Sequence, residues 1–457
     1  MQHLGIRIDI KNKPELDGGF IPYFRFNQAF LKTADQPFSI AIERNDKQIH
    51  IKETFVHGDD AHKDADLYYL DRLIKFELWQ KGGFRIYIIG NDSLYKKLKQ
   101  EYSPGGAREF DARFMGLVYQ KDFEIIKCDK LPEPFEMEKT AGGHFDGCRI
   151  GVDFGGSDYK VAAVIDGKAV YTSETVWNPK INSDPDYHLS NVTAAMKEAA
   201  EHLPQVDAIG VSSAGLIGNN RVLYAQLYWQ VAPELHNSRI RDIYYHAADK
   251  ISKDLPLEVA NDGDVAVLAG AISLGKNNMV GLALGTSFAG GFLDRNGNLS
   301  TWINELGFTP VDVSPNAAVE EWTGDKGIGV HYFSQEAVIK LAPAAGIQLD
   351  QYETPAEKLK AVQNLLIEGH KGATAIFESI GCYLGHTIPL YYDVYKADNY
   401  LLLGRTVSGK GGDIIAETAN KVINDEYPEL SVEILLPDEK TRRMGQSVAA
   451  ASLPKIN

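Results

Sequence analysis

The chain has 457 residues, of which 44% are hydrophobic and 24% are charged, as in an ordinary folded globular protein. This length exceeds what one average hydrophobic core holds, so two or three domains are expected. The formal net charge of −15 argues against nucleic-acid binding, which requires clustered Lys and Arg. It does not exclude ATP, because phosphate sites are built from local backbone groups and metal ions.

No targeting or membrane segment is expected. The N-terminal residues MQHLGIRIDIKNK lack the apolar segment and the small-residue cleavage site of a signal peptide. The sequence has no run of about 18 apolar residues, so we expect no membrane span. Cys128, Cys148 and Cys382 are widely spaced and odd in number, which suits a reducing compartment and forms no CxxC zinc pair. We therefore expect a cytoplasmic protein.

Residues 1–147 are predicted to form an extra α+β domain of unknown role. Its expected elements are two strands in residues 38–56 around Asn45-Asp46, a helix at 68–80, a strand at 84–89 and a helix at 93–102. We interpret Gly105-Gly106-Ala107-Arg108 as a surface turn and not as a phosphate loop, because it does not lie between a strand and a helix. Residues 128–147 are rich in Pro and charge and are expected to be a linker.

Residues 148–171 are predicted to form two strands around Gly155-Gly156-Ser157, followed by a turn at Asp166-Gly167. Asp-Gly between apolar runs is a strong hairpin signal. Asp153 ends the first strand, directly before the glycines. A carboxylate there can hold Mg²⁺ through water, while glycines let backbone N–H groups approach phosphate oxygens. The alternative is an ordinary hairpin whose Asp starts a turn.

The next elements favour an α/β sheet. A helix at 189–203 precedes a buried strand at 206–211, which leads into Ser212-Ser213-Ala214-Gly215. A helix followed by a parallel-type strand implies a crossover connection. The strand at 257–260 ends at Asn261-Asp262. Asp264 is predicted to cap the N-terminus of a helix at 265–274, which Gly275 closes.

A second hairpin repeats the design of the first. Strands at 280–284 and 288–293 flank Gly285-Thr286-Ser287, and a turn follows at Asn296-Gly297. Two such turns favour a nucleotide whose phosphates are bound from both sides by turn N–H groups and hydroxyls. The last third is predicted to contain helices at 356–368, 372–395 and 445–453 and strands at 399–403 and 432–436. Gly404 suits the adenine or ribose of a nucleotide, or is a simple strand-to-helix turn.

Over residues 149–453 these motifs resemble the ROK family, which contains sugar kinases and related repressors of the actin-like ATPase superfamily. Asp153-Phe154-Gly155-Gly156-Ser157 with Lys160 resembles the family's DxGGTxxK phosphate motif, and Asn261-Asp262 resembles its NDAN motif. Leu284-Gly285-Thr286 with Gly290-Gly291 resembles LGTGxGGG, and Asn304-Glu305-Leu306-Gly307 resembles GE(L/I)GH. The resemblance implies two ribonuclease-H-like α/β domains around a cleft, at residues 148–275 and 276–457.

The resemblance breaks at the family's zinc site. The zinc-binding His of the family is Phe308 here, and its CxCGxxGCxE loop corresponds to residues 323–330. The cysteine positions are Thr323 and Ile328, and the sugar-binding Glu is Val330. Such a set cannot hold tetrahedral Zn²⁺, so no structural zinc is expected. Without that Glu, the family's usual sugar preference cannot be assumed.

The resemblance implies ATP- and Mg²⁺-dependent phosphorylation of a hydroxyl on a sugar or similar polyol. Asp262 would accept the hydroxyl proton, and Asp153 would hold Mg²⁺ through water. A cap or turn role is the structural alternative for Asp262. The residues expected to bind ATP and its phosphates are Asp153, Gly155, Gly156, Ser157, Lys160, Gly285, Thr286, Ser287 and Gly404. Those expected to contact the substrate are Ser213, Gly215, Asn261 and Glu305.

Two other functions are compatible with these residues. One is a catalytically silent sensor or scaffold that binds a sugar or nucleotide, which the lost zinc ligands and Val330 favour. The other is an actin-like ATPase with a protein partner, for which residues 1–147 would be the docking module. No helix-turn-helix signature or basic face is present in residues 1–147, so no nucleic-acid partner is expected. A homodimer is an expectation from the resemblance alone.

Overall fold

The computed structural model describes residues 1–137, 142–437 and 439–456, so four residues of the predicted linker, 138–141, lie outside the described part. The chain forms two compact units. Unit 1 comprises Met1–Met137, Leu282–Gly290 and Trp302–Leu436. Unit 2 comprises the described residues of Glu138–Gly281, Gly291–Thr301 and Pro437–Asn457. The first 137 residues therefore share a unit with most of the last third of the chain.

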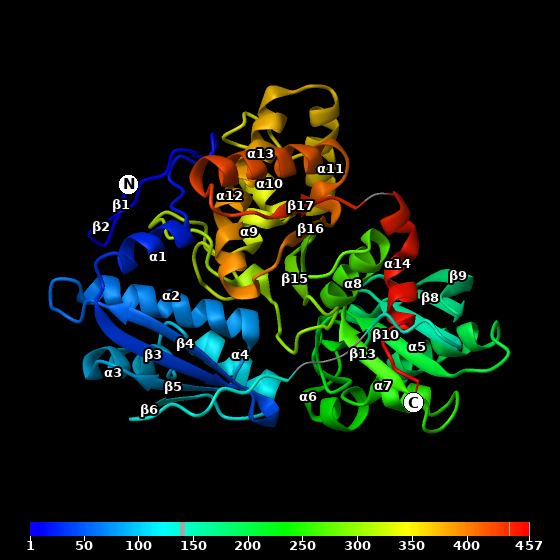
Figure 1. Ribbon diagram of the computed structural model, residues 1–457. Helices are drawn as coiled ribbons and strands as arrows, with labels where there is room; N and C mark the ends of the chain where they lie inside the picture. Colours follow the sequence, from blue (N-terminus) through cyan, green and yellow to red (C-terminus); the bar gives the residue numbers. More distant parts are fainter. Residues whose placement is uncertain (138–141, 438, 457) are drawn as a thin grey trace. The chain divides into compact units, whose positions relative to one another are not determined.

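The N-terminal part of unit 1 is a helix-covered sheet. Its elements are β1 Gln2–His3, β2 Ile6–Arg7, α1 Tyr23–Leu31, β3 Gln36–Glu43, β4 Ile49–Val56, α2 Lys63–Lys81, β5 Arg85–Ile89, α3 Asp92–Glu101, α4 Glu109–Tyr119 and β6 Glu124–Lys127. The sheet order is β4-β3-β5-β6, and α2 runs across one face of it (Figure 1). The predicted strand pair around Asn45-Asp46 is confirmed as β3 and β4. Helix α4 was not predicted.

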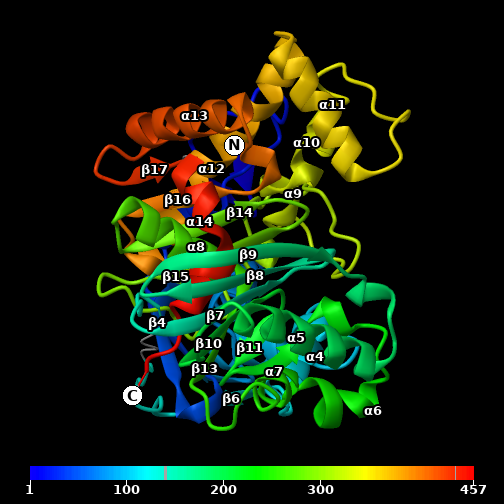
Figure 2. The same ribbon diagram turned by 90° about the vertical axis from the view of Figure 1, so that its right-hand side faces the viewer.

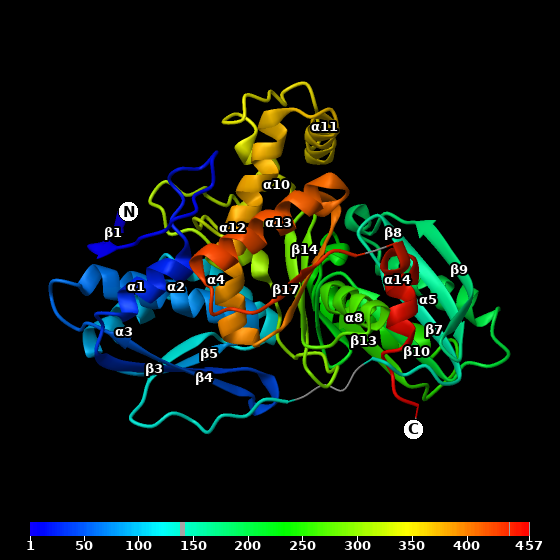
Figure 3. The same cartoon turned by 45° about the horizontal axis from the view of Figure 1, so that its top comes forward.

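The C-terminal part of unit 1 is mainly helical, as expected. Its elements are α9 Val330–Phe333, α10 Gln335–Leu341, α11 Pro355–Ile367, α12 Lys371–Tyr395, β16 Asn399–Leu403, α13 Lys410–Glu426 and β17 Glu433–Leu435. Helices α12 and α13 pack against each other (Figure 3). Gly381 and Gly385 permit this approach, because an added Cβ would lie 2.7 Å from the Ile415 carbonyl oxygen or 2.6 Å from Val422 Cβ.

Unit 2 is built on a five-stranded sheet. Its elements are β7 Cys148–Phe154, β8 Asp158–Ile165, β9 Lys168–Val176, α5 Pro185–Ala200, β10 Ala208–Ser213, β11 Leu216–Gly218, β12 Arg221–Tyr224, α6 Pro233–Leu235, α7 Ile243–Ala248, β13 Leu257–Asn261, α8 Asp262–Leu274 and α14 Glu439–Ala451. The boundaries between the two units fall within strands β14 Met279–Leu284 and β15 Phe288–Leu293. These two strands belong to a four-stranded sheet of order β15-β14-β16-β17.

The unit 2 sheet has the order β13-β10-β7-β8-β9. Strands β7, β10 and β13 are parallel, while β8 and β9 are antiparallel neighbours. One face carries apolar side chains such as Ile150 and Val211, which pack with Val192 and Met196 of α5 and with Tyr244 of α7. Helix α14 packs on β7, β8 and β10 (Figure 2). Alternation of side chains along the strands separates these two faces.

Glycines in the sheet make room for α14. A Cβ on Gly210 would lie 1.7 Å from the Ala450 carbonyl oxygen, and one on Gly151 would lie 1.9 Å from that of Ser447. Such distances require backbone movement, so Gly210→Ala is expected to lower the free energy of unfolding by about 1–3 kcal/mol. Urea unfolding followed by circular dichroism measures this loss.

Gly18→Ala is the control for that variant, because a Cβ there meets nothing within 4 Å. Its urea midpoint should equal that of the wild type. A Gly210→Ala protein as stable as the control would show that α14 does not press on the sheet as described.

One predicted cap is wrong. Helix α8 begins at Asp262, three residues earlier than expected, and its N-cap is Asn261, whose Oδ1 accepts a hydrogen bond from the Gly263 N–H at 2.8 Å. Asp264 lies inside the first turn, is buried, and accepts a 3.4 Å hydrogen bond from the Phe292 N–H. The prediction failed because Asn261, the last residue of β13, is itself a good N-cap residue and starts the helix directly after the strand. No helix of the described residues is long and apolar enough to cross a membrane.

Candidate functional site

The carboxyl ends of three neighbouring parallel strands bring the unit 2 candidates together. In the register of β7 and β10, Asp153 pairs with Ser212. In the register of β10 and β13, Ser213 pairs with Asn261. Ligands of open α/β sheets bind at this edge, because loops and helix N-termini leave polar groups there. Asp153, Asn261 and the adjoining Asp262 therefore lie at one edge of the unit 2 sheet, which makes this edge the candidate site.

Asp153 is a buried carboxylate with one strong neutral partner. The Ser212 hydroxyl donates to Asp153 Oδ1 at 2.6 Å, and only 5% of Asp153 is exposed. Burial raises the pKa of Asp153 to about 6, and the negative charge of Asp262 adds to the rise, while Ser212 and Lys160 oppose it. An ionised Asp153 is therefore under-compensated by the protein itself, and a cation beside it restores the balance.

Asn261 and Asp262 form the junction between β13 and α8. Asn261 Nδ2 donates to the Gly215 carbonyl oxygen at 2.8 Å, so this side chain both caps the helix and holds the β10 loop. Asp262 Oδ1 accepts a 3.0 Å hydrogen bond from the Gly263 N–H. Burial raises the pKa of the Asp262 carboxyl above its usual range. A raised pKa makes a carboxylate a better proton acceptor.

The first glycine turn (Gly155, Gly156 and Ser157) is held from outside by one tryptophan. Trp177 Nε1 donates to the Gly155 carbonyl oxygen at 2.9 Å, and the Trp177 N–H donates to the Ser157 carbonyl oxygen at 3.0 Å. These bonds fix the peptide groups of the turn. Lys180 also reaches it: a Cβ on Gly156 would lie 2.8 Å from Lys180 Cε and 3.1 Å from its Nζ.

Asp158 occupies the polar groups of this turn. The Ser157 hydroxyl donates to Asp158 Oδ2 at 2.8 Å, and Lys160 Nζ contacts Asp158 Oδ1 at 2.6 Å. A phosphate bound here must therefore replace Asp158 as the partner of both groups. Sequence reasoning missed Asp158, Trp177 and Lys180. Of these three, only Asp158 could have been noticed in the sequence, because a carboxylate inside a phosphate-binding motif is unusual.

Ser213 and Gly215, two predicted substrate contacts, lie at the end of β10 and in the loop that follows it. Ser213 is fully buried, and its hydroxyl lies 2.6 Å from that of Tyr244. The Ser213 hydroxyl is therefore hydrogen-bonded within unit 2, and its predicted contact with the substrate stays a prediction. Gly215 has a φ of +124°, and a Cβ there would lie 2.5 Å from Ala225 Cβ, so the loop requires glycine.

The remaining candidates belong to unit 1. In the second glycine turn (Gly285, Thr286 and Ser287), the Gly285 N–H donates to the Ser287 carbonyl oxygen at 3.0 Å, and Thr286 and Ser287 are exposed. The Glu305 N–H donates to the Trp79 carbonyl oxygen at 2.9 Å, which ties it to α2. Gly404 has a φ of +98°, and a Cβ there would lie 2.3 Å from the Leu284 carbonyl oxygen, so strand packing already requires glycine.

The positions that correspond to the family's zinc ligands do not fit a metal. Phe308 offers a phenyl ring, which lies 4.4 Å from the ring of Trp79, and Ile328 is a fully buried aliphatic side chain. The Thr323 hydroxyl accepts a hydrogen bond from the Asp325 N–H at 3.2 Å. Within the described ranges, no three His, Cys, Asp or Glu residues are grouped to hold a metal ion.

Known proteins resemble this chain in family and in fold. The model of the ROK family matches residues 149–447. A ROK family transcriptional regulator, a homolog of the E. coli MLC protein, is 17% identical with a TM-score of 0.53 over 68% of this chain and 78% of its own. The ROK hexokinase from Thermus thermophilus is 15% identical with a TM-score of 0.50 over 66% and 96%. A ROK family protein from Streptococcus pneumoniae TIGR4 in complex with sucrose is 12% identical, with a TM-score of 0.50 over 67% and 96%. No curated protein matches the chain.

Proposed function

This chain belongs to the ROK family, and from that membership we propose that it transfers the γ-phosphoryl group of ATP to a hydroxyl of a sugar or related polyol. The observation that carries the proposal is the pair of carboxyl groups with raised pKa, Asp153 and Asp262, at one edge of the unit 2 sheet. Perturbed carboxyl groups brought together at such an edge are typical of a functional site. The fold is mixed α/β and sugar-kinase-like.

Asp262 is the proposed general base. Its carboxylate accepts the proton of the acceptor hydroxyl while that oxygen bonds to the γ-phosphorus and ADP leaves. Its position at the start of α8, with its Oδ1 bonded to the Gly263 N–H, fixes the carboxylate. Asn261 and Glu305 are the proposed hydrogen-bonding partners of the sugar hydroxyls, and Gly215 shapes the loop beside Asn261.

The first glycine turn, with Lys160 and Lys180, is proposed to bind phosphate oxygens. Its backbone is already fixed by Trp177, so little ordering is required when a phosphate binds. The second glycine turn is proposed as a further phosphate contact, on the strength of its exposed Thr286 and Ser287. Mg²⁺ that enters with ATP would be held at Asp153 through water and would neutralise phosphate charge. Asp153 fits this role because its ionised form lacks a compensating charge.

The order of the strands in the unit 2 sheet supports a more specific fold for this unit. Three parallel strands followed, on one side of the sheet, by a pair of strands with antiparallel connections agree with a ribonuclease-H-like domain of the actin-like ATPases, which we propose for unit 2. A second candidate function is sugar or nucleotide binding without catalysis. Asp158 favours it, because this carboxylate engages both Ser157 and Lys160, the groups that a phosphate would use.

A sugar panel tests the two candidates. We expect one or more monosaccharides to raise ADP release from ATP-Mg²⁺ above the sugar-free rate, measured in a coupled spectrophotometric assay. The same panel in a thermal-shift assay reports binding, because a ligand that binds only the folded state raises its melting temperature. A sugar that stabilises the protein without releasing ADP would instead support the silent sensor.

A further inference from the structure

Unit 1 contains a segment, residues 304–330, that the N-terminal region holds at three places. The Tyr23 N–H donates to the Val311 carbonyl oxygen at 2.9 Å, and the Val313 N–H donates to that of Ile21 at 2.9 Å. At the end of α2, the Asn304 N–H donates to the Gln80 carbonyl oxygen at 2.9 Å, next to the Glu305 bond already described. The third place is a buried cluster of charges around Asp325.

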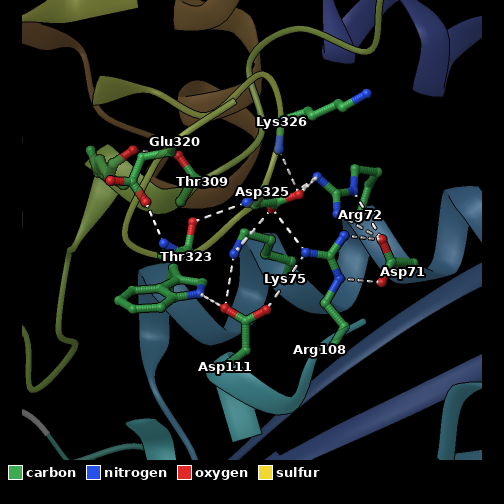
Figure 4. A network of polar contacts seen from close by, with 12 residues as sticks. Asp71, Arg72, Lys75, Arg108, Asp111, Thr309, Glu320, Thr323, Asp325 and Lys326 are labelled. Atoms are coloured by element: carbon green, nitrogen blue, oxygen red, sulfur yellow. Dashed lines mark hydrogen bonds and ion pairs between the residues drawn. The ribbon is translucent and has the colours of Figure 1, made fainter. Parts of the chain in front are cut away.

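The charge cluster comprises Asp71, Arg72, Lys75, Arg108, Asp111 and Asp325 (Figure 4). Three cations from the N-terminal region converge on Asp325. Arg72 Nη1 lies 3.1 Å from both carboxylate oxygens, Lys75 Nζ lies 3.1 Å from Oδ2, and Arg108 Nη1 lies 2.9 Å from Oδ2. Arg72 and Asp325 are 253 residues apart in the sequence.

The cluster is electrically balanced and largely buried, and its most exposed side chain, Asp71, is 13% exposed. Lys75 also donates to Asp111 at 2.8 Å, and Arg108 makes two bonds to Asp71, at 2.6 and 2.7 Å. Three carboxylates thus face three cations. Lys75 is fully buried and Asp325 is 9% exposed. Burial alone would raise the pKa of Asp325, but the charges of Arg72 and Lys75 outweigh it and lower the pKa. Asp325 therefore stays ionised, and removing any one charge leaves an uncompensated net charge in the buried cluster.

An aromatic group lies beside the charge cluster. Trp79 of α2 packs on Phe308 with ring centroids 4.4 Å apart and on Phe114 of α4 at 4.9 Å. Trp322 packs edge-on to Phe308 at 5.4 Å. The Trp79 indole also donates to Asp111 Oδ1 at 2.6 Å, so a hydrogen bond joins the aromatic group to the charge cluster. Helix α2 thereby holds the segment at Phe308 and at Asp325. Helix α4 holds it at Trp322 through Phe114 and, through its N-cap residue Arg108, at Asp325.

We infer that helices α2 and α4 replace the missing metal in fixing residues 304–330. The residues that would have to coordinate zinc are used otherwise: Phe308 packs on Trp79, Ile328 is buried, and Thr323 accepts from Asp325. The N-terminal region is therefore part of the structure that positions Glu305, and Asp325 is a positioning residue. Its consequence for sugar binding rests on the proposed function, whereas the fixing of the segment does not.

Hydrogen–deuterium exchange on the full-length protein tests the inference. Asp325→Asn keeps the shape of the side chain but leaves one excess positive charge in the cluster. We expect amide exchange in residues 304–330 to rise at least tenfold, with no change in unit 2. Adding Arg108→Gln removes the excess charge, so the double variant should exchange more slowly than Asp325→Asn alone. Asp242→Ala, which breaks the Arg221 ion pair in unit 2, should leave the segment unchanged.

Three outcomes would overturn the inference: unchanged exchange in Asp325→Asn, an increase spread evenly over the chain, or no recovery in the double variant. Stoichiometric zinc in the purified protein, or a melting temperature lowered by a chelator, would also overturn it. If a sugar substrate is found, Asp325→Asn should raise the KM for sugar at least fivefold and leave the KM for ATP unchanged. If no sugar is phosphorylated, exchange and metal content still decide the role of α2 and α4.

Discussion

Asp262→Asn is expected to lower kcat for phosphoryl transfer by about 10²–10⁴-fold, the usual contribution of a general base. The amide cannot accept the hydroxyl proton, although its carbonyl oxygen can still take the hydrogen bond from the Gly263 N–H. The melting temperature and the shift that sugar produces should therefore persist. A coupled ADP assay gives kcat, and thermal unfolding gives the other two quantities.

The pH dependence of the wild type follows from the same carboxyl group. Burial raises the pKa of Asp262, and only the ionised form accepts a proton, so kcat/KM should fall as the pH drops through that raised value. The exposed Asp249→Asn is the control, and its activity should match the wild type at every pH. An Asp262→Asn enzyme that retains more than a tenth of wild-type kcat would contradict the assignment.

Asp153→Asn is expected to inactivate the protein and to stabilise it. The pKa of this carboxyl is about 6 in the folded state against an ordinary value of 3.8, so the folded protein binds the proton more tightly. Stability is then lost as the pH rises from about 4 to 6, and the loss persists above pH 6. A neutral amide at this position does not undergo this loss, so Asp153→Asn should be more stable than the wild type at pH 8 by up to about 3 kcal/mol.

Urea unfolding at pH 4, 6 and 8 checks this prediction. The gain should disappear near pH 4, where the wild-type carboxyl is protonated in the folded state as well. Asp254→Asn is the matched control, because that side chain is exposed and Asn tolerates its left-handed backbone, so no pH-dependent gain should appear. The prediction fails if Asp153→Asn is less stable than the wild type at pH 8, or if its gain is the same at all three pH values.

Short-range signals predicted much of the fold. Asp166 and Gly167 adopt φ values of +46° and +77°, as a tight hairpin turn requires, and Gly275 closes α8 in the left-handed conformation. These outcomes depend on a few adjacent residues. The strands that end at Asp153 and Asn261 were also predicted. Parallel strands place their carboxyl ends at one edge of a sheet, so these residues and Asp262 come close together.

Long-range contacts could not be predicted in the same way. Helix α4 has apolar residues on several sides, and its Phe114 and Asp111 are explained only by Trp79 and Lys75 of α2. The role of Asp325 depends on Arg72, far away in the sequence, so no local pattern reveals it. Similarly, the close approach of Gly404 to the Leu284 carbonyl oxygen joins residues far apart in the sequence, so no local pattern shows it, and the nucleotide contact of Gly404 stays a prediction.

The assembly of unit 1 from both ends of the chain has a consequence during synthesis. At about 5–20 residues per second, the first 137 residues leave the ribosome roughly 10 to 30 s before residue 302 is made. Throughout that time Trp79 lacks Phe308, and Arg72 and Lys75 lack Asp325. Unit 1 can therefore be completed only after most of the chain has been made, and until then the N-terminal region presents these side chains without their C-terminal partners.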